Sequence, residues 1–388
     1  MKKYKILFFS SGRSDFELLL PIINKLQKNK SIQLNLIISG SHLSKRHGYT
    51  INEVKKHKIK NIKKINIKCE KVNEKNIYHI FTRSQKLYSN FINSFKNKVH
   101  LAVVLGDRYE ALSFGLSCFF QNIHLAHIHG GEITNGSKDD TIRHILTKLS
   151  NLHFVSHSSH KKRVLQLGES NQNIHNFGLL GKENILKLKL NNKKQITNLL
   201  KIDANKDNIL VSYHPVTVLS KKQNKIQFQQ VLSALLYFKN HNIIFTAPNI
   251  DPGNLDILKM TKKFVEENSN AFFFESLGQK KFFSLAKNSK IFIGNSSSGI
   301  LEIPFLNIPV LDIGIRQEGR HKFQKVHHSS ANRKNIINKI NNILKNKIKT
   351  KNKMNSKNTS RLISASIINY LKYNKFDNQL KKFKDLKV

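Results

Sequence analysis

The sequence predicts an α/β protein built from two doubly wound domains. Short, near-continuous apolar runs alternate with amphipathic segments, which is typical of a parallel sheet covered by helices on both faces. The alternation stops in a polar, Lys- and Asn-rich stretch at residues 182–207 and then starts again. The length of 388 residues accommodates two domains of roughly 100–200 residues each.

The first domain is expected to span residues 1–178. Apolar runs predict its strands at residues 4–10, 33–40, 101–106, 124–129, 152–156 and 174–178. Amphipathic periodicity predicts its helices at residues 15–29, 109–121, 139–150 and 159–169. A last amphipathic segment at 361–372 is expected to pack back on this domain, so residues 360–388 would complete it.

The second domain is expected to span residues 179–359, with a hinge near 178–182. Its strands are predicted at residues 208–213, 242–246, 271–275, 290–293 and 309–313. Its helices are predicted at residues 223–239, 278–289 and 332–345.

The composition restricts the class of protein. The 67 Lys and Arg against 24 Asp and Glu give a formal charge of +43, which would normally suggest a nucleic-acid partner. However, only 10 of the basic residues are Arg, the better residue for phosphate and base recognition, and the lysines are dispersed among Asn and Ile. This pattern indicates a coding bias and no nucleic-acid partner.

Membrane and disulfide classes are also disfavoured. No apolar run approaches the roughly 18 residues of a membrane span, and the first apolar run is too short for a signal peptide. Two Cys, at positions 69 and 118, suggest neither a disulfide framework nor a cysteine zinc site. We expect a cytoplasmic protein without a membrane partner.

Ligands of open parallel sheets bind at the carboxyl ends of strands, so polar residues just after each apolar run are the candidates. The first strand ends in Ser-Ser-Gly followed by Arg13, whose cation at a helix start could meet a phosphate. An ordinary capped helix start explains the same residues. Neither a dinucleotide fingerprint nor a P-loop is present here.

Two further strand ends in the first half carry charged groups. Gly106 is followed by Asp107 and Arg108, which fit either a structural ion pair or a site. Residues 124–132 read HLAHIHGGE, and the pair His127 and His129 on one face of a strand could also hold a metal.

In the second half, His214 stands before a proline at a strand end, and residues 294–302 read GNSSSGILE. Such a small-residue turn exposes amides and hydroxyls at a helix start, a suitable seat for a diphosphate. Glu302 could accept hydrogen bonds from ribose hydroxyls, whereas a plain Ser-rich N-cap would give the turn a structural role only. Arg316 and Arg320 follow the next strand.

These residues resemble a known family, the hydrolysing UDP-N-acetylglucosamine 2-epimerases of bacterial sialic acid biosynthesis. The matching motifs follow one another along most of the chain: the Arg13 turn, 40–42 (GSH), 106–108 (GDR), 127–132 (HIHGGE), 139–144 (DDTIRH), 214–215 (HP), 294–299 (GNSSSG), 316–317 (RQ) and 319–320 (GR). The resemblance implies a GT-B-like architecture with an interdomain cleft, a homo-oligomer (dimer or tetramer), a UDP-sugar substrate, and neither metal nor redox cofactor.

The resemblance also implies the reaction. UDP leaves C1 as the C2 proton is lost, water adds to the resulting 2-acetamidoglucal, and C2 is reprotonated from the other face, which gives N-acetylmannosamine. The residues implied in catalysis are Asp107, Glu132, Asp139, His129 and His214. Those implied in substrate and nucleotide binding are Arg13, His42, Arg108, Arg143, Asn295, Ser296, Ser297, Ser298, Gly299, Glu302 and Arg316.

The sequence leaves the C2 base and the exact sugar open. Many relatives carry Glu where this chain has His129, so more than one residue is a candidate for the base. A sister branch acts on a UDP- or GDP-linked 2,4-diacetamido-trideoxy sugar for legionaminic acid synthesis, and the motifs do not separate the two branches. A GT-B glycosyltransferase would share the fold and a basic nucleic-acid-binding protein would share the charge, but neither explains Asp107, Glu132 and Asp139 together.

Overall fold

The computed structural model divides the chain into two compact units. Unit 1 comprises Met1–Glu132, Asp139–Glu183 and Lys357–Val388, and unit 2 comprises Ile133–Lys138 and Asn184–Ser356. The structure describes residues 3–70, 72, 75–95, 99–135, 137–249, 251–322, 326–346, 358–374, 376 and 381–386. No helix within these ranges is long and apolar enough to cross a membrane.

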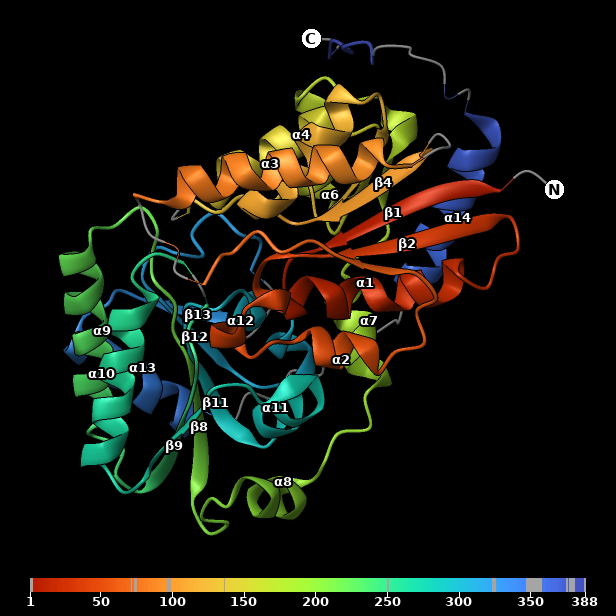
Figure 1. Ribbon diagram of the computed structural model, residues 1–388. Coiled ribbons are helices and arrows are strands. Elements are labelled where there is room, and N and C mark those ends of the chain that lie inside the picture. Colours follow the sequence, from red (N-terminus) through yellow and green to blue (C-terminus); the bar gives the residue numbers. More distant parts are fainter. Residues whose placement is uncertain are drawn as a thin grey trace. The chain divides into compact units, whose positions relative to one another are not determined.

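Unit 1 is built on a parallel sheet (Figure 1). Within the described residues this sheet has seven strands in the order β3-β2-β1-β4-β5-β6-β7. The strands are β1 (Tyr4–Ser10), β2 (Ile32–Ile38), β3 (Ile62–Lys64), β4 (Leu101–Leu105), β5 (His124–Ile128), β6 (Leu152–Val155) and β7 (Ile174–Asn176).

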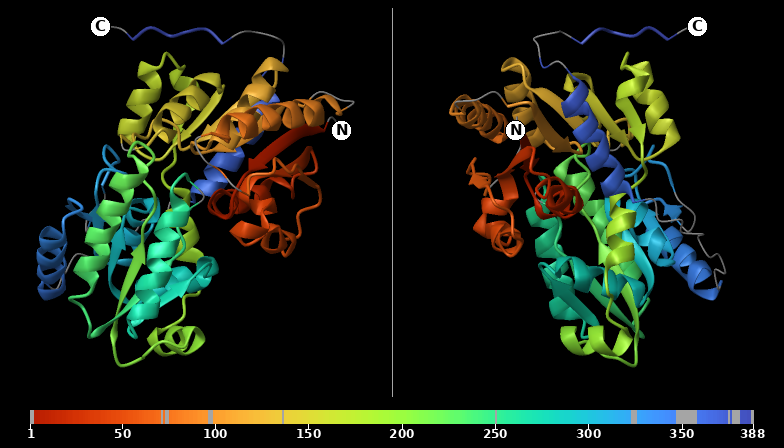
Figure 2. Two further views of the ribbon diagram at one scale, coloured as in Figure 1. Left: turned by 60° about the vertical axis from the view of Figure 1, so that its left-hand side comes forward. Right: turned by 90° about the vertical axis from the view of Figure 1, so that its right-hand side faces the viewer.

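Helices cover both faces of this sheet (Figure 2). They are α1 (Arg13–Leu26), α2 (Ile51–Lys55), α3 (Ile77–Asn93), α4 (Tyr109–Phe120), α5 (Asp139–Leu149), α6 (Ser158–Gln166), α7 (Leu180–Lys187) and α14 (Thr359–Tyr373).

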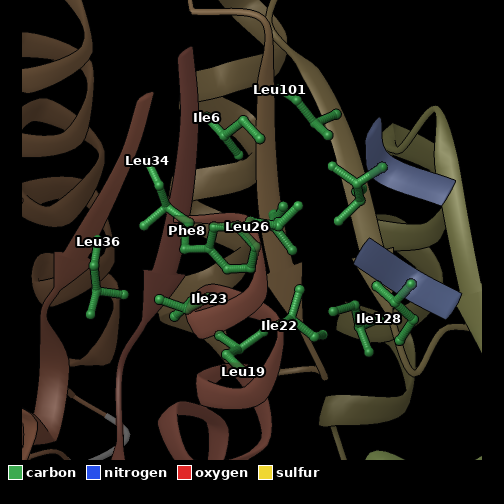
Figure 3. Packing of buried hydrophobic residues seen from close by; sticks show 14 of the residues in the cluster. Ile6, Phe8, Leu19, Ile22, Ile23, Leu26, Leu34, Leu36, Leu101 and Ile128 are labelled. Atoms are coloured by element: carbon green, nitrogen blue, oxygen red, sulfur yellow. The ribbon is translucent and has the colours of Figure 1, made fainter. Parts of the chain in front are cut away.

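Successive residues of β1 enter different cores, because side chains alternate across a strand. Ile6 and Phe8 pack with α1 and α14, as the close view of this cluster shows for α1 (Figure 3). Leu7 and Phe9 pack with α3 and α4 on the opposite face. A strand buried on both faces favours a continuous apolar run, which is why the centre of β1 reads ILFF.

The C-terminal helix α14 is held to unit 1 by an apolar face and a polar anchor. Ile363 and Ile367 are buried in the same core as α1. At its start, the backbone amide and the hydroxyl of Ser360 donate to the Glu183 carboxylate over 2.6 and 2.7 Å, and both residues are buried. Residues from the end of the chain therefore complete the first unit.

Unit 2 repeats the architecture. Its described residues form six parallel strands in the order β10-β9-β8-β11-β12-β13. The strands are β8 (Asp207–Ser212), β9 (His241–Thr246), β10 (Ala271–Phe274), β11 (Ser289–Gly294), β12 (Val310–Ile313) and β13 (Val326–Ser329). The helices are α8 (Lys193–Leu200), α9 (Lys221–Leu235), α10 (Asn254–Glu267), α11 (Gly278–Lys287), α12 (Ser297–Leu301) and α13 (Arg333–Lys345).

Each sheet changes winding direction at its centre. The chain runs outward from β1 to β3 and then returns to β4 beside β1, and it does the same at β8 and β11. In doubly wound sheets the ligand crevice lies outside the carboxyl ends of the two strands at this reversal. The relevant positions are thus the ends of β1 and β4 in unit 1, and of β8 and β11 in unit 2.

The expected architecture of two parallel α/β domains is confirmed, whereas some elements were not foreseen. The polar stretch 182–207, expected to be a connection, contains α8 and most of α7. Helix α8 packs on the core through an apolar face formed by Ile196 and Leu200. The helices α3 and α10 and the edge strands β3 and β13 were also missed. The contacts place the division between the units after Glu183 and assign residues 133–138 to unit 2.

Candidate functional site

The turn after β1 is organised by a carboxylate from α1. Asp15 accepts hydrogen bonds from the amides of Ser11 and Gly12 over 2.7 and 2.9 Å. These amides are therefore occupied within the protein. Arg13, the first residue of α1, keeps a partly exposed guanidinium 3.9 Å from Glu17. Of the residues in this turn, Arg13 remains a candidate for binding an anion.

His42 has a different position from the one expected of a substrate ligand. Its ring is fully buried, and its nitrogens are bonded to the hydroxyls of Ser10 (2.9 Å) and Thr50 (2.8 Å). Burial lowers the pKa of His42 to about 4, so the ring is neutral at neutral pH. We assign His42 to holding the loop after β2 against the end of β1.

The end of β4 carries two ionised side chains with separate partners. The Arg108 guanidinium donates to the buried carboxylate of Glu110 over 3.1 and 3.3 Å. Asp107 accepts a hydrogen bond from Arg143, a residue of α5. Glu110 had no distinctive signal in the sequence beyond its place at the start of a helix.

Arg143 lies in the interior of unit 1. Its side chain is 1% exposed, and it donates to the backbone carbonyl of Glu132 (2.9 Å) and to the Asp140 carboxylate (3.3 Å) as well as to Asp107. These contacts use the Arg143 guanidinium within unit 1, and its role in substrate binding stays a prediction. Where the sequence suggested substrate binding, the structure has Arg143 joining Asp107 to the turn that carries Glu132.

The two histidines of the HIHGGE segment differ in their surroundings. His127 is fully buried, with its nitrogens bonded to Thr147 Oγ1 (3.1 Å) and to the carbonyl of Gly106 (2.7 Å), and burial lowers its pKa to about 3. His129 instead places Nδ1 3.1 Å from the Glu132 carboxylate. Because both nitrogens of His127 are used, the pair does not form a metal site; no group of three or more potential ligands occurs among the described residues.

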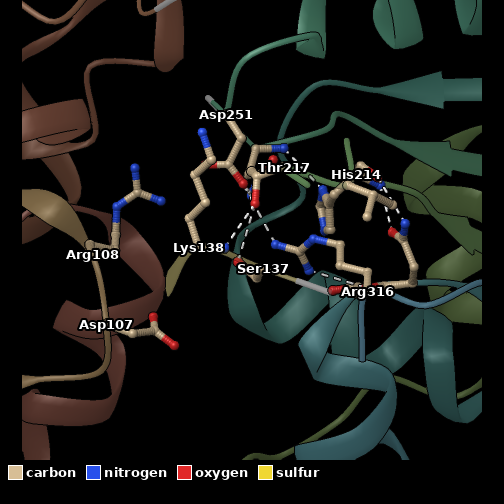
Figure 4. Close-up of polar contacts among 12 residues, drawn as sticks. Asp107, Arg108, Ser137, Lys138, His214, Thr217, Asp251 and Arg316 are labelled. Atoms are coloured by element: carbon tan, nitrogen blue, oxygen red, sulfur yellow. Dashed lines mark hydrogen bonds and ion pairs between the residues drawn. The ribbon is translucent and has the colours of Figure 1, made fainter. Parts of the chain in front are cut away.

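Asp139 begins α5 and is partly buried. Its neighbour Asp140, which the sequence did not single out, pairs with Arg143 and with His144 Nε2 (3.4 Å). The residues between Glu132 and Asp139 pack on unit 2: the amide of Lys138 donates to Thr217 Oγ1 over 3.2 Å, as Figure 4 shows. Nothing in the composition of residues 133–138 indicates that role.

In unit 2, three of the predicted residues come together at the ends of β8 and β11. The amide of His214 donates to Asn295 Oδ1 (2.7 Å), and Asn295 Nδ2 donates to the carbonyl of His214 (2.8 Å). Arg316 Nη1 donates to the carbonyl of Asn295 (3.1 Å), and its guanidinium lies 3.6 Å from Asp251 (Figure 4). Within the described part of the chain, the buried Arg316 Nε has no hydrogen-bond partner.

The protonation of His214 follows from its contacts. Its Nδ1 accepts the amide N–H of Asn249 over 3.0 Å, and burial, reinforced by the charge of Arg316, holds the pKa of His214 well below its usual value. The ring is therefore neutral and carries its proton on Nε2. Asn249 and Asp251 were missed in the sequence, although they follow β9 as polar residues at a strand end.

The serine turn after β11 has a role in the fold. Ser296 caps α12 by accepting the Ser298 amide over 3.4 Å. A Cβ at Gly299 would lie 2.9 Å from the Phe292 ring, so this glycine is required for packing. Ser297 opens α12, and Glu302 follows its last residue.

Comparison with known proteins decides the family. The profile described as UDP-N-acetylglucosamine 2-epimerase matches residues 24–368. The chain belongs to this family. Membership makes it a nucleotide-sugar 2-epimerase, and the expected resemblance is confirmed.

Relatives of this epimerase support the same conclusion. It is 39% identical over 335 residues, 86% of each chain, to a GDP/UDP-N,N'-diacetylbacillosamine 2-epimerase (hydrolyzing) of Campylobacter jejuni. It is 35% identical, over 87% of this chain and 85% of the relative, to the polysialic acid biosynthesis protein P7 of Escherichia coli. The structure of a Neisseria meningitidis UDP-GlcNAc 2-epimerase bound to UDP-GlcNAc shares the GT-B-like fold, with a TM-score of 0.77 at 18% identity over 94% and 100% of the two chains.

Proposed function

We propose that the chain is a hydrolysing 2-epimerase that converts a UDP-linked 2-acetamido sugar and water into UDP and the free 2-epimer. The observation that carries this proposal is the group formed by His214, Asn295 and Arg316 at the reversal of the second sheet. There a neutral His214 offers Nε2–H, and Arg316 has an Nε to which no described residue hydrogen-bonds. Both are donors suited to the oxygens of a departing diphosphate.

The proposed division of roles follows from the two units. Unit 2 would bind the nucleotide through His214, Arg316, Ser296–Ser298 and Glu302. Unit 1 would supply the proton transfers at C2 from the ends of β4 and β5, where Asp107, held by Arg143, is a partly exposed carboxylate. Cleavage of C1–O builds positive charge at C1 and acidifies the C2 proton, so a side chain can remove it.

For the sugar, we propose UDP-N,N'-diacetylbacillosamine as the first candidate. Relatives with this substrate in their names are 39% and 30% identical to the chain. UDP-GlcNAc, the substrate expected from the sequence, is the second candidate, because relatives named for it are 28% and 24% identical.

The test is product identification by NMR in D₂O with UDP-N,N'-diacetylbacillosamine, its GDP analogue and UDP-GlcNAc. We expect release of the nucleotide and of the free 2-epimer, with deuterium at C2. Nucleotide release that requires an added sugar acceptor would instead support a glycosyltransferase. Treatment with EDTA should leave turnover unchanged, since both nitrogens of His127 are occupied and no metal is invoked.

A pair of matched variants tests the site. D107N should reduce turnover by about 100-fold or more while UDP binding is retained, because the amide cannot carry a proton between sugar and solvent. D385N, an equivalent change at an exposed position of the C-terminal tail, should leave turnover unchanged. Equal losses in both variants, or loss of UDP binding in D107N, would contradict the assignment.

A further inference from the structure

Four buried side chains next to the end of β5 form a hydrogen-bonded series. His129 Nδ1 is 3.1 Å from Glu132 Oε1, Ser156 Oγ is 3.2 Å from the same oxygen, and His160 Nδ1 is 3.0 Å from Ser156 Oγ. All four residues are less than 10% exposed. They come from the end of β5, the turn after it, the end of β6 and helix α6.

The direction of each proton in this series follows from the donors that are present. Burial lowers the pKa of His160 to about 4, so His160 is neutral at neutral pH. The Ser156 hydroxyl has one proton, which it donates to Glu132, and His160 must then donate its Nδ1 proton to Ser156. The Glu132 carboxylate thus accepts from Ser156 on one side and from the Nδ1–H of His129 on the other.

This arrangement leaves the other nitrogen of His129 as a base. With the proton on Nδ1, Nε2 carries a lone pair. Nε2 is buried, and no described residue hydrogen-bonds to it. An unpaired buried polar atom costs stability, about 1–3 kcal/mol, unless a ligand satisfies it.

The backbone at His129 is a second unfavourable feature. Its φ is +69°, in the left-handed region that favours glycine and costs other residues about 1–2 kcal/mol. The turn cannot relax easily, since a Cβ at Gly131 would lie 2.4 Å from the carbonyl of His160 and Arg163 holds the carbonyl of Gly131 over 3.0 Å. Residues that the surrounding structure holds in an unfavourable backbone conformation cluster at functional sites.

His129 is also in the right place within the sheet. It follows β5 as Asp107 follows the neighbouring parallel strand β4, so both lie at the edge of the sheet where ligands bind. Arg143 connects Asp107 to the turn that follows His129, because it contacts Asp107 and the carbonyl of Glu132.

We propose that His129 Nε2 is the base that removes the C2 proton of the sugar, and that Glu132 is a positioning residue that sets the tautomer of His129. This inference rests on the proposed 2-epimerase function, and it gives different roles to the carboxylates of Asp107 and Glu132. Glu132 stabilises the imidazolium that forms, as the aspartate does in a Ser-His-Asp triad. Ser156 and His160 hold Glu132 in place from behind.

Atoms and electrons balance in both steps of the reaction. The C2 proton passes to Nε2, the C2–H electron pair becomes the second bond of C1=C2, and UDP leaves with the electrons of C1–O. In the second step Asp107 takes a proton from solvent and delivers it to C2 on the other face, where the C1=C2 electron pair becomes the new C2–H bond. Water adds to C1 and loses a proton, and His129 returns its own proton to solvent.

The first test uses H129G, because glycine accepts a φ of +69° and leaves space for an added imidazole. We expect UDP release to fall at least 1000-fold, UDP affinity to be retained, and millimolar imidazole to raise the rate of the variant at least tenfold. Hydration of the 2-acetamidoglycal supplied directly should fall less than tenfold, since that step does not use the base. H175Q, a change in a histidine stacked on Phe177, is the matched control with unchanged rates.

The second test is the division of the E132Q effect between kcat and KM. We expect kcat to fall about 100-fold at unchanged KM, because glutamine supplies no counter-charge to the imidazolium that forms on His129. If Glu132 only supported the fold, the amount of folded enzyme would fall while kcat per folded enzyme stayed at the wild-type value.

The outcomes separate the two proposals. A wild-type chain that releases no nucleotide from any of the sugar nucleotides would overturn the proposed function and this inference together. An active wild type with H129G within tenfold of its rate, or with glycal hydration lost as fully as UDP release, would overturn only the role of His129.

Discussion

Arg143 and Arg316 are both arginines of the motif series, and their surroundings give them different roles. Arg143 is 1% exposed and donates to groups of unit 1, so its guanidinium orients Asp107 and the turn that carries Glu132. Arg316 keeps Nε without a partner among the described residues, and its charge acts on the neutral His214. Arg143 therefore positions other side chains, whereas Arg316 has a donor that could bind an anion.

The role of Arg143 predicts the effect of R143K. Lysine keeps the charge but cannot contact Asp107, Asp140 and the Glu132 carbonyl with one planar fork. We expect kcat to fall about 100-fold with UDP affinity retained, as measured by steady-state kinetics and by calorimetric titration with UDP. R361K, at an exposed position of α14, should behave as wild type; a wild-type kcat for R143K would show that Asp107 needs no such support.

At the scale of elements, the turns that end the central strands fix the geometry of the candidate residues within each unit. In unit 1 the end of β5 bends through His129 and Gly131, both with positive φ. In unit 2 the end of β11 passes so close to β8 that a Cβ at Gly294 would lie 2.0 Å from the carbonyl of Ser212. The two central strands can approach here only because residue 294 has no side chain.

The close approach predicts a large effect of G294A. Both the overlap with the Ser212 carbonyl and a φ of +137° oppose a side chain, so we expect a loss of about 3 kcal/mol or more in the free energy of unfolding. G278A is the control: it also has a positive φ, +64°, but open space around its Cβ, and should cost about 1 kcal/mol. Urea unfolding of both variants measures the difference, and similar losses would contradict the steric argument.

At the scale of the whole molecule, each unit is closed by chain from elsewhere in the sequence, α14 in unit 1 and residues 133–138 in unit 2. Several histidines of the molecule are also buried as neutral rings. His42 and His127 are fully buried in unit 1, and their pKa values are lowered to about 4 and about 3. The net charge of +43 also lowers the stability of the folded protein in acid, because further protonation increases repulsion in the folded state.

These histidines predict loss of stability in acid. Their pKa is lower in the folded state than the unfolded value near 6.5, so below that pH the unfolded chain binds more protons and unit 1 loses stability as pH falls towards 4. We expect each of the two to contribute about 1 kcal/mol of loss between about pH 7 and about pH 5.5, measured by urea unfolding. H127Q should reduce this pH dependence and H79Q, at an exposed position, should not; equal slopes in the two variants would refute the assignment.

The sequence by itself determined the fold class and the order of the motifs. Apolar runs buried on both faces and the polar residues at their ends are local properties, and they located β1, β4, β5, β8 and β11 within one or two residues. Among the missed elements, α8 is short and polar and β13 has four residues, so the few apolar side chains of each become visible only against a core.

Only the tertiary structure decided which polar residues can meet a ligand. Asp107 and Arg143 are 36 positions apart, and His42 and Ser10 are 32 apart, so no local pattern records their pairing. A buried ionic or imidazole group is stable only when its partners are supplied, and folding supplies them from distant parts of the chain. The same residue type thus becomes a structural anchor at Arg143 and His42 and a proposed functional group at Arg316 and His129.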